Sequence, residues 1–424
     1  MSRGLETVEA EIERAVLVVV NQDESEDSIV ENELEGLCEA AGVEPLAIIR
    51  QRLDRPYKGT YVGTGKVGEI GELAKELSAD LVLIDGEVSG MQQRNLEEAF
   101  QCKVIDRTQL ILDIFAGRAR TKEGMLQVEL AQLTYMMPKL MSVYTKFERQ
   151  KGGIGMRGPG ETKLEADKRV AKDKIAKLKH EIEDVKRVRD QQRASRRKHP
   201  FPFASIVGYT SAGKSTLMNR LAGTDVLVDA MPFATLDPTT RKIDLPEGYA
   251  LFLTDTVGFI RNLPTHLVAA FRSTLEEVTH SDFILHVIDV STPAWEVQRD
   301  AVLETLEKLG ASDKPMLTVF NKIDALEDQH MATKLVSEWA NSIAISAVTG
   351  KGVDDLLHAI RKQVQSLLGS VKALVPYSES GLVQDCYDFG RVHKVDYRNE
   401  GIYVEAELVA EMRQKLAKYA VESE

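Results

Sequence analysis

The sequence predicts an α/β protein of several domains, and three observations lead to this prediction. Short apolar runs alternate with amphipathic helical patterns over most of the 424 residues, which is typical of sheets with mostly parallel strands. A long stretch of heptad spacing interrupts this alternation. Two prolines, Pro200 and Pro202, then precede a second alternation. The length alone predicts roughly three domains, and the patterns divide the chain into four parts: 1–120, 121–199, 200–370 and 371–424.

The first part is expected to be an α/β domain. Its apolar runs are short and rich in β-branched residues, as in buried strands. The expected strands are 15–20, 46–52, 61–62, 81–84 and 103–105, and the expected helices are 28–41, 66–77, 89–100 and 108–116.

The second part is expected to be an antiparallel coiled-coil hairpin. Proline inside a helix removes a hydrogen bond, so Pro138 predicts a kink or a break near Met137. The glycine-rich segment KGGIGMRGPG, 151–160, would be the loop at the tip. The first apolar seam is Leu126, Leu130, Leu133, Met137, Leu140, Tyr144 and Phe147, and the second is Leu164, Ala171, Ile175, Leu178, Ile182 and Val185.

The last two parts are expected to be a second α/β domain with a mostly parallel sheet and a small α+β domain. In the small domain we expect a strand near 373–375, a helix, a strand pair at 391–396 and 401–406, and a final helix. The strands expected in the larger domain are 203–207, 251–254, 283–289, 316–320 and 343–345.

The charge is unevenly distributed. The chain has a net charge of −12, yet residues 101–200 carry 24 basic and 13 acidic side chains, which is 24 − 13 = +11. A basic middle between acidic regions indicates a polyanionic partner, although a solvated charged helix gives the same pattern.

Three scattered cysteines exclude a disulfide scaffold and fit a reducing cytosol. An acidic beginning without a long apolar run predicts no signal peptide and no membrane span, and hence a cytoplasmic protein.

The clearest motif is GYTSAGKS at 208–215, which fits G-x-x-x-x-G-K-[ST] between an apolar strand and a helical pattern. Gly208 and Gly213 allow the backbone to wrap a phosphate, and the amides at the helix start favour negative charge. Lys214 is expected to reach the β- and γ-phosphates. The Ser215 hydroxyl is expected to bind Mg²⁺.

Three further motifs follow at strand ends. DTVG at 255–258 places a carboxylate near Mg²⁺ and lets the Gly258 amide approach a γ-phosphate. NKID at 321–324 ends in Asp324, which can accept two hydrogen bonds from guanine but not from adenine. The backbone of Ser346 and Ala347 is placed to cap the guanine O6. Together the four motifs predict a site for GTP and GDP.

These motifs resemble those of translation-factor-related GTPases, and the sequence is similar beyond them to the HflX family of ribosome-associated GTPases. The similarity rests on GYTSAGKSTLMNRL, FATLDPTTR at 233–241, DTVGFIRNLP, GTGKVGEI and GGIGMRGPGETKLE. It implies a P-loop GTPase domain in 200–370. It also implies that Thr235 closes on Mg²⁺ and the γ-phosphate, with Thr239 or Thr240 as alternatives.

On this basis, the expected metal ligands are Ser215 and Thr235, and the residues expected to act in hydrolysis are Lys214, Thr235 and Gly258. The full set expected to bind the nucleotide is Gly208, Tyr209, Thr210, Ser211, Ala212, Gly213, Lys214, Ser215, Thr216, Phe233, Ala234, Thr235, Leu236, Asp237, Asp255, Thr256, Val257, Gly258, Asn321, Lys322, Ile323, Asp324, Ser346, Ala347 and Val348.

Two positions bear on the mechanism. Phe259 stands where many small signalling GTPases have the glutamine that orients water, so we expect slow intrinsic hydrolysis that a partner stimulates. Family members commonly have Asn at position 211, which in some related GTPases helps to bind an activating K⁺. This chain has Ser211, which lacks that carbonyl oxygen, so K⁺ stays an open cofactor beside Mg²⁺.

The resemblance implies binding of the large ribosomal subunit and its rRNA, and the splitting or rescue of stalled ribosomes under stress. Alternatives are a GTP-dependent binding module for a protein partner, and ATP-dependent RNA remodelling by the N-terminal domain. GTGK at 63–66 is either an ordinary strand–helix turn or a contact for ATP. We expect a monomer, in which RNA contacts come from Lys151, Arg157, Lys163, Arg193, Arg196 and Arg197.

Overall fold

The computed structural model describes residues 12–21, 27–149, 159–196, 201–223, 231–233, 235–261 and 272–421. The chain forms two compact units. Unit 1 is Met1–Ile182 with Met231–Phe233 and Leu263–Ala270, and unit 2 is Glu183–Ala230, Ala234–Asn262 and Phe271–Glu424. No helix in the described ranges has the length and apolar content needed to cross a bilayer.

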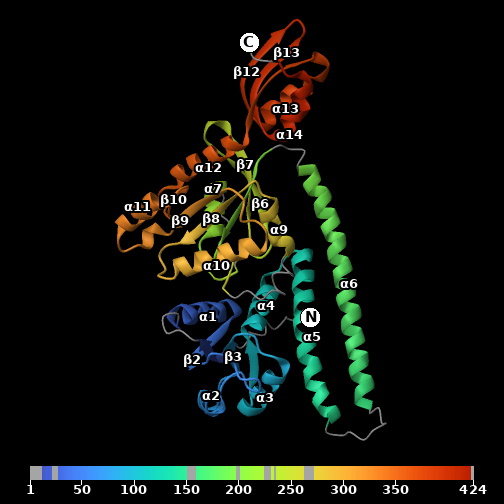
Figure 1. Ribbon diagram of the computed structural model, residues 1–424, viewed down its shortest axis with the longest axis vertical. Helices are drawn as coiled ribbons and strands as arrows, with labels where there is room; N and C mark the ends of the chain where they lie inside the picture. Colours follow the sequence, from blue (N-terminus) through green and yellow to red (C-terminus); the bar gives the residue numbers. More distant parts are fainter. Residues whose placement is uncertain are drawn as a thin grey trace, which may run out of the picture. The chain divides into compact units, whose positions relative to one another are not determined.

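Unit 1 contains a parallel four-stranded sheet in the order β2-β1-β3-β4. Its strands alternate along the chain with helices, as the sequence predicts (Figure 1). The prediction of a strand at 61–62 is wrong, because Tyr57 and Tyr61 form only an isolated bridge. The elements are β1 (Glu13–Asn21), α1 (Asp27–Ala41), β2 (Val43–Arg52), α2 (Thr64–Glu76), β3 (Leu81–Asp85), α3 (Gly90–Phe100), β4 (Lys103–Asp106) and α4 (Arg107–Arg118).

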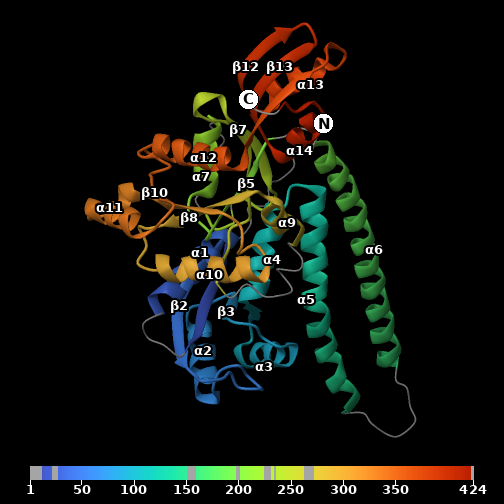
Figure 2. The same cartoon turned by 45° about the horizontal axis from the view of Figure 1, so that its top comes forward.

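Two long helices follow, α5 (Lys122–Arg149) and α6 (Pro159–Arg196). They run side by side in opposite directions in both views (Figures 1 and 2), and an ion pair of 2.6 Å joins Lys174 of α6 to Glu129 of α5. Leu178, in the predicted seam of α6, is buried. The antiparallel hairpin is therefore present. Of the two outcomes expected near Met137, a kink or a break, the break is absent, because α5 continues through Pro138.

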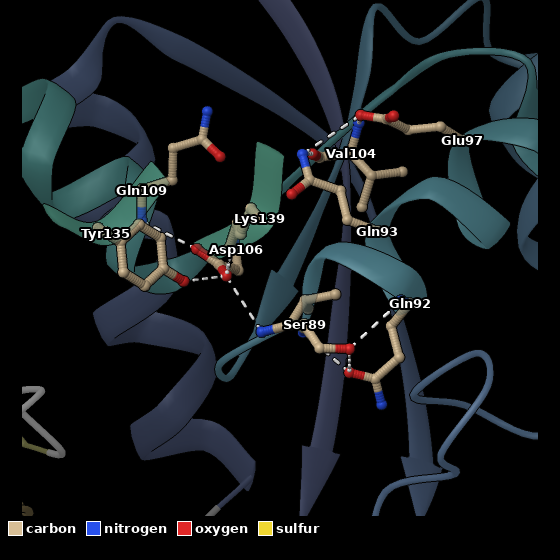
Figure 3. A network of polar contacts seen from close by, with 10 residues as sticks. Ser89, Gln92, Gln93, Glu97, Val104, Asp106, Gln109, Tyr135 and Lys139 are labelled. Carbon is tan, nitrogen blue, oxygen red and sulfur yellow. Dashed lines mark hydrogen bonds and ion pairs between the residues drawn. The ribbon is translucent and has the colours of Figure 1, made fainter. Parts of the chain in front are cut away.

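A polar network explains how α5 is held where proline weakens it (Figure 3). The buried carboxylate of Asp106 caps α4 by accepting from the Gln109 amide at 2.9 Å. It also accepts a hydrogen bond from Tyr135 and pairs with Lys139 at 2.6 Å. Tyr135 and Lys139 lie on either side of Pro138, so these contacts anchor α5 on both sides of a residue that costs about 3 kcal/mol inside a helix.

Unit 2 contains a six-stranded sheet in the order β10-β9-β8-β5-β7-β6, parallel except for the edge strand β6. The sequence analysis missed β6. The strands are β5 (Phe203–Gly208), β6 (Thr239–Asp244), β7 (Ala250–Asp255), β8 (Phe283–Asp289), β9 (Met316–Asn321) and β10 (Ser342–Ala344). The helices and short turns are α7 (Lys214–Ala222), η2 (Pro246–Gly248), α9 (Arg272–His280), α10 (Trp295–Lys308), η3 (Ile323–Ala325), α11 (Gln329–Glu338) and α12 (Val353–Leu367).

The C-terminal part is a three-stranded antiparallel sheet in the order β11-β13-β12 with helices on it, which confirms the predicted α+β tail. Tyr249 of the larger domain donates a hydrogen bond of 2.5 Å to Glu407 of β13. The elements are β11 (Gly369–Val375), η4 (Tyr377–Glu379), α13 (Gly381–Phe389), β12 (Arg391–Arg398), β13 (Gly401–Leu408), α14 (Ala410–Leu416) and η5 (Ala417–Tyr419).

A buried histidine lies on the central strand β8. His286 is 2% exposed, and its Nε2 has no hydrogen-bond partner among the described residues. Burial, with the nearby charges of Arg299 and Lys214, lowers the pKa of His286 from 6.5 to about 4. The folded state therefore holds the neutral imidazole, and the unfolded chain binds a proton more readily between those two values.

We expect His286 to make folding sensitive to mild acid. Its contribution is fully present above about pH 6.5 and falls as the pH drops toward 4, because only the unfolded chain gains the proton. At one pKa unit per 1.36 kcal/mol, the loss at pH 5 is about 2 kcal/mol. Urea unfolding of the full chain at pH 7 and pH 5 should therefore show a smaller acid loss in His286→Leu. The same change at the exposed His358 is the control, and equal acid losses in all three proteins would contradict the expectation.

Candidate nucleotide site

The predicted phosphate loop connects β5 to α7, and two of its glycines are required by close contacts. A Cβ on Gly208 would lie 2.2 Å from the Val287 carbonyl oxygen. A Cβ on Gly213, which has φ +90°, would lie 2.3 Å from Asn321 Nδ2. Any larger residue would push the loop away from β8 and β9. The loop therefore turns tightly into the first turn of α7, where free amides favour an anion.

Lys214 lies under this loop. Its Nζ donates hydrogen bonds to the carbonyl oxygens of Gly208 at 3.1 Å and Tyr209 at 2.7 Å. Burial lowers the pKa of Lys214 to about 8, and the charge of Asp255 acts in the opposite direction. A phosphate beside Nζ would add negative charge next to a poorly solvated ammonium group, which is a favourable arrangement.

Three oxygens from distant segments converge beside Lys214. The Ser215 hydroxyl lies 2.7 Å from Thr235 Oγ1 and donates to Asp255 Oδ2 at 2.7 Å. Thr235 Oγ1 also donates to Asp255 Oδ2, at 3.1 Å. Thr240, one of the alternatives to Thr235, instead pairs with Thr254 at 2.9 Å. The structure therefore brings together the two residues predicted as metal ligands.

The Asp255 carboxylate has the properties of a cation site. It is 3% exposed, and its Oδ1 has no hydrogen-bond partner within the described residues. Burial raises the pKa of Asp255, while Lys214 and the two hydroxyl donors lower it. Hydroxyl and carboxylate oxygens are the ligands that Mg²⁺ prefers, so the residues present fit this ion.

Gly258 lies against the phosphate loop. A Cβ there would come within 2.9 Å of Thr210 Cγ2 and 3.1 Å of Lys214 Nζ. The next residue, Phe259, is 2% exposed, and its amide and carbonyl pair with Gly208 O at 3.1 Å and Thr210 N at 2.8 Å. The Phe259 ring is thus packed in the interior. The backbone of Phe259 pairs with the phosphate loop in a parallel bridge to Tyr209.

The predicted base-reading residues lie at the ends of β9 and β10. Asn321 links two loops, because its Nδ2 donates to Ala212 O at 2.8 Å and its Oδ1 accepts from the Ala347 amide at 3.0 Å. Lys322 pairs with Asp289 at 2.7 Å. Asp324, in η3, is exposed, so its carboxylate is open to a ligand.

Two residues that the sequence analysis placed at the nucleotide pack into cores instead of projecting as free side chains. Phe233 is 2% exposed and packs edge-on against Phe115 of α4, with ring centroids 4.6 Å apart. Its neighbour Met231 accepts a contact from Arg118, which places Met231–Phe233 in unit 1. Leu236 is buried as well.

The predicted RNA contacts fall partly on α6 and partly outside the described residues. Ala234 of the nucleotide set and three of the RNA candidates, Lys151, Arg157 and Arg197, lie outside the described residues. Lys163, Arg193 and Arg196 lie on α6.

The segment at 63–66 forms the start of α2. The Gly63 amide donates to Gln51 at 3.0 Å, and Lys66 pairs with Glu69 of the same helix at 2.8 Å. These contacts are those of an ordinary strand–helix turn. Binding of ATP there stays a prediction.

Four family models match this chain and cover most of it. They are "GTP-binding GTPase N-terminal" at 29–116, "GTP-binding GTPase Middle Region" at 118–196, "50S ribosome-binding GTPase" at 203–322 and "HflX C-terminal domain" at 331–419. "GTPase HflX" of Lacrimispora saccharolytica is 46% identical over 99% of each chain, and "GTPase HflX" of Escherichia coli K12 is 43% identical over 92% of each. The chain belongs to the HflX family of GTPases.

Membership in the HflX family confirms the resemblance read from the motifs, and it makes the chain a GTP hydrolase that binds guanine nucleotides. Among solved structures, the complex of SsGBP with GDP is 27% identical, covers 84% of this chain and 99% of that one, and has a TM-score of 0.48.

Sequence motifs did not reveal every residue around the site of this HflX protein. Arg220, near the end of α7, binds two carbonyls of the loop after β10. No spacing rule connects positions 220 and 347; only the parallel order of β5, β8, β9 and β10 brings their loops to one edge. The sequence offered one signal for Arg220, its position as a basic residue in the last turn of the helix that follows the phosphate loop.

Proposed function

We propose that the loops after β5, β7, β9 and β10 form the GTP site, with Ser215 and Thr235 as Mg²⁺ ligands and Asp255 beside them. The convergence of these three side chains within 2.7–3.1 Å carries the proposal. Mg²⁺ would supply charge neutralisation for the β- and γ-phosphates. Lys214 would bind the same phosphates, and the Gly258 amide would approach the γ-phosphate. The Asp324 carboxylate would accept two hydrogen bonds from the guanine ring.

We further propose that hydrolysis is slow without a partner. The buried Phe259 ring stands at the position where a water-orienting side chain is common, and a phenyl group can neither orient nor deprotonate water. Binding energy from a macromolecular partner would then complete the site.

The proposed partner is the large ribosomal subunit, with stalled ribosomes split or rescued as the outcome under stress. Three features support it: the basic middle of the chain, the antiparallel hairpin of α5 and α6, and the similarity of 203–322 to a family described as "50S ribosome-binding GTPase". Basic side chains are exposed along α6, including Lys172 and Lys179, two turns apart. Such side chains would contact successive RNA phosphates, and this electrostatic attraction weakens as the salt concentration rises.

Co-sedimentation with ribosomal subunits tests this proposal. We expect binding to the large subunit with a non-hydrolysable GTP analogue, less binding with GDP, and faster GTP hydrolysis when the subunit is present. Lys172→Glu with Lys179→Glu should reduce binding at least about tenfold at moderate salt, because two phosphate contacts become repulsive.

The matched control for this experiment is Lys308→Glu with Lys334→Glu, which makes the same charge change on α10 and α11. Equal binding by both double variants would contradict a role for α6. No binding in any nucleotide state would favour the alternative of a protein-partner module, and dependence on ATP that survives Lys214→Ala would favour RNA remodelling by the N-terminal domain. K⁺ dependence, a monomeric state and a cytoplasmic location stay predictions.

A further inference from the structure

The loop after β10 contains five consecutive amides, and most of them already have protein acceptors. Ser346 N donates to Lys351 O at 2.9 Å, and Ala347 N donates to Asn321 Oδ1 at 3.0 Å. Thr349 N donates to Ser346 Oγ at 3.0 Å, and Gly350 N to Ser346 O at 2.9 Å. Within the described part of the chain, the Val348 amide has no acceptor.

The peptide that carries this amide is held from its other side. Arg220 Nε donates to the carbonyl oxygen of Ala347 at 3.1 Å, and Arg220 Nη2 donates to the carbonyl oxygen of Val348. The Ala347 carbonyl and the Val348 amide belong to one planar trans peptide, in which C=O and N–H point in opposite directions. A guanidinium group that fixes the carbonyl therefore also fixes the direction of the open N–H.

The charge of Arg220 adds to this effect. A hydrogen bond from a cation to a peptide carbonyl is stronger than a neutral one. It also polarises the peptide, which makes the N–H at the other end a better donor. The planar fork of arginine can hold two successive carbonyls at once, whereas lysine offers a single point charge.

Arg220 also connects the two halves of the nucleotide site. It lies on α7, the helix that begins at the phosphate loop. The loop that it holds is the one expected to cap the guanine O6, and the proposal below rests on that assignment. The expected donors were the backbone groups of Ser346 and Ala347, but their amides already have acceptors, which leaves the Val348 amide. A residue on the phosphate-binding helix thus determines the geometry of the base-binding loop.

We propose that Arg220 is a positioning residue for guanine recognition, which orients the Ala347–Val348 peptide so that its amide donates to the guanine O6. It does not contact the nucleotide. Replacing it should weaken the binding of bases with a strong acceptor at position 6 and spare the binding of bases without one.

The test compares GDP with 6-thio-GDP, whose sulfur is a weak acceptor while its N1–H and 2-amino groups are unchanged. In the full chain, Arg220→Gln should weaken GDP binding about tenfold and 6-thio-GDP binding less than about threefold. Arg220→Lys should show the same asymmetry with smaller losses. Arg361→Gln is the matched control, because Arg361 pairs with Glu247 at 3.1 Å and with none of these loops.

Equal losses for the two ligands, or no loss for either, would overturn the inference, since a residue that only stabilises the domain does not distinguish oxygen from sulfur. If Arg220→Gln fails to fold, Arg220→Lys decides by the same comparison. Unaltered protein that binds neither ligand would instead refute the site assignment itself.

Discussion

Lys214→Ala should abolish GTP turnover, with a fall of at least about 100-fold, because the variant loses the buried cation that is proposed to bind the phosphates. Loss of one preorganised electrostatic group typically costs this much in a reaction that develops charge. Nucleotide affinity should fall about 10- to 100-fold, as expected for a charge-assisted hydrogen bond. Turnover is measured as phosphate release with and without ribosomal subunits, and affinity by calorimetry.

The fold should tolerate this change. Among the described residues, Lys214 Nζ hydrogen-bonds only to the carbonyl oxygens of Gly208 and Tyr209, and burial lowers the pKa of Lys214 to about 8. Removing it also removes the cost of burying the charge, so the unfolding midpoint should stay close to that of the unaltered protein. Lys242→Ala is the matched control, since Lys242 is half-exposed on the edge strand β6. GTP turnover that is unchanged in Lys214→Ala would refute the assignment of the phosphate loop.

The predictable parts of the site are those whose functional residues follow one another along the chain or come directly after a strand. A strand, a glycine-rich turn and a helix start are consecutive in the sequence, so GYTSAGKS could be placed on a strand–loop–helix unit without a structure. The same holds for Asp255 and Asn321, because the carboxyl ends of parallel strands meet at one edge of a sheet. Arg220 was not predicted, because the carbonyls to which it donates hydrogen bonds lie more than 120 residues away in the sequence.

The errors in the fold have the same origin. Pro138 favours a kinked or broken helix locally, yet α5 continues through it, with Tyr135 and Lys139 both bonded to Asp106 of the neighbouring strand β4. The edge strand β6 has the sequence TTRKID, whose polar residues give a weak strand signal, and it pairs antiparallel with β7 at the edge of the sheet. Tertiary contacts outweigh local propensity in both cases.

Asp324→Asn should change the base that the protein prefers from guanine to xanthine. The carboxylate is expected to accept from the guanine N1–H and 2-amino groups, whereas an Asn amide can donate to the carbonyl that xanthine has at position 2. GTP affinity should fall about 100-fold or more, because a site built on paired hydrogen bonds leaves polar groups unpaired with the wrong base. XTP affinity should rise in the same variant, and competition between the two nucleotides measures both effects at once.

The exposure of Asp324 makes this a test of recognition and not of folding. Its side chain is open to solvent in η3, so the substitution removes no buried contact, and surface substitutions usually change stability by less than 0.5 kcal/mol. Asp313→Asn, an equal charge change on an exposed loop before β9, should leave the preference for guanine intact. If Asp324→Asn kept full GTP affinity, the base would have to be read elsewhere; the Val348 amide that Arg220 orients would then separate guanine from adenine, because adenine has an amino group in place of the O6 acceptor, and it would not separate guanine from xanthine, which keeps O6.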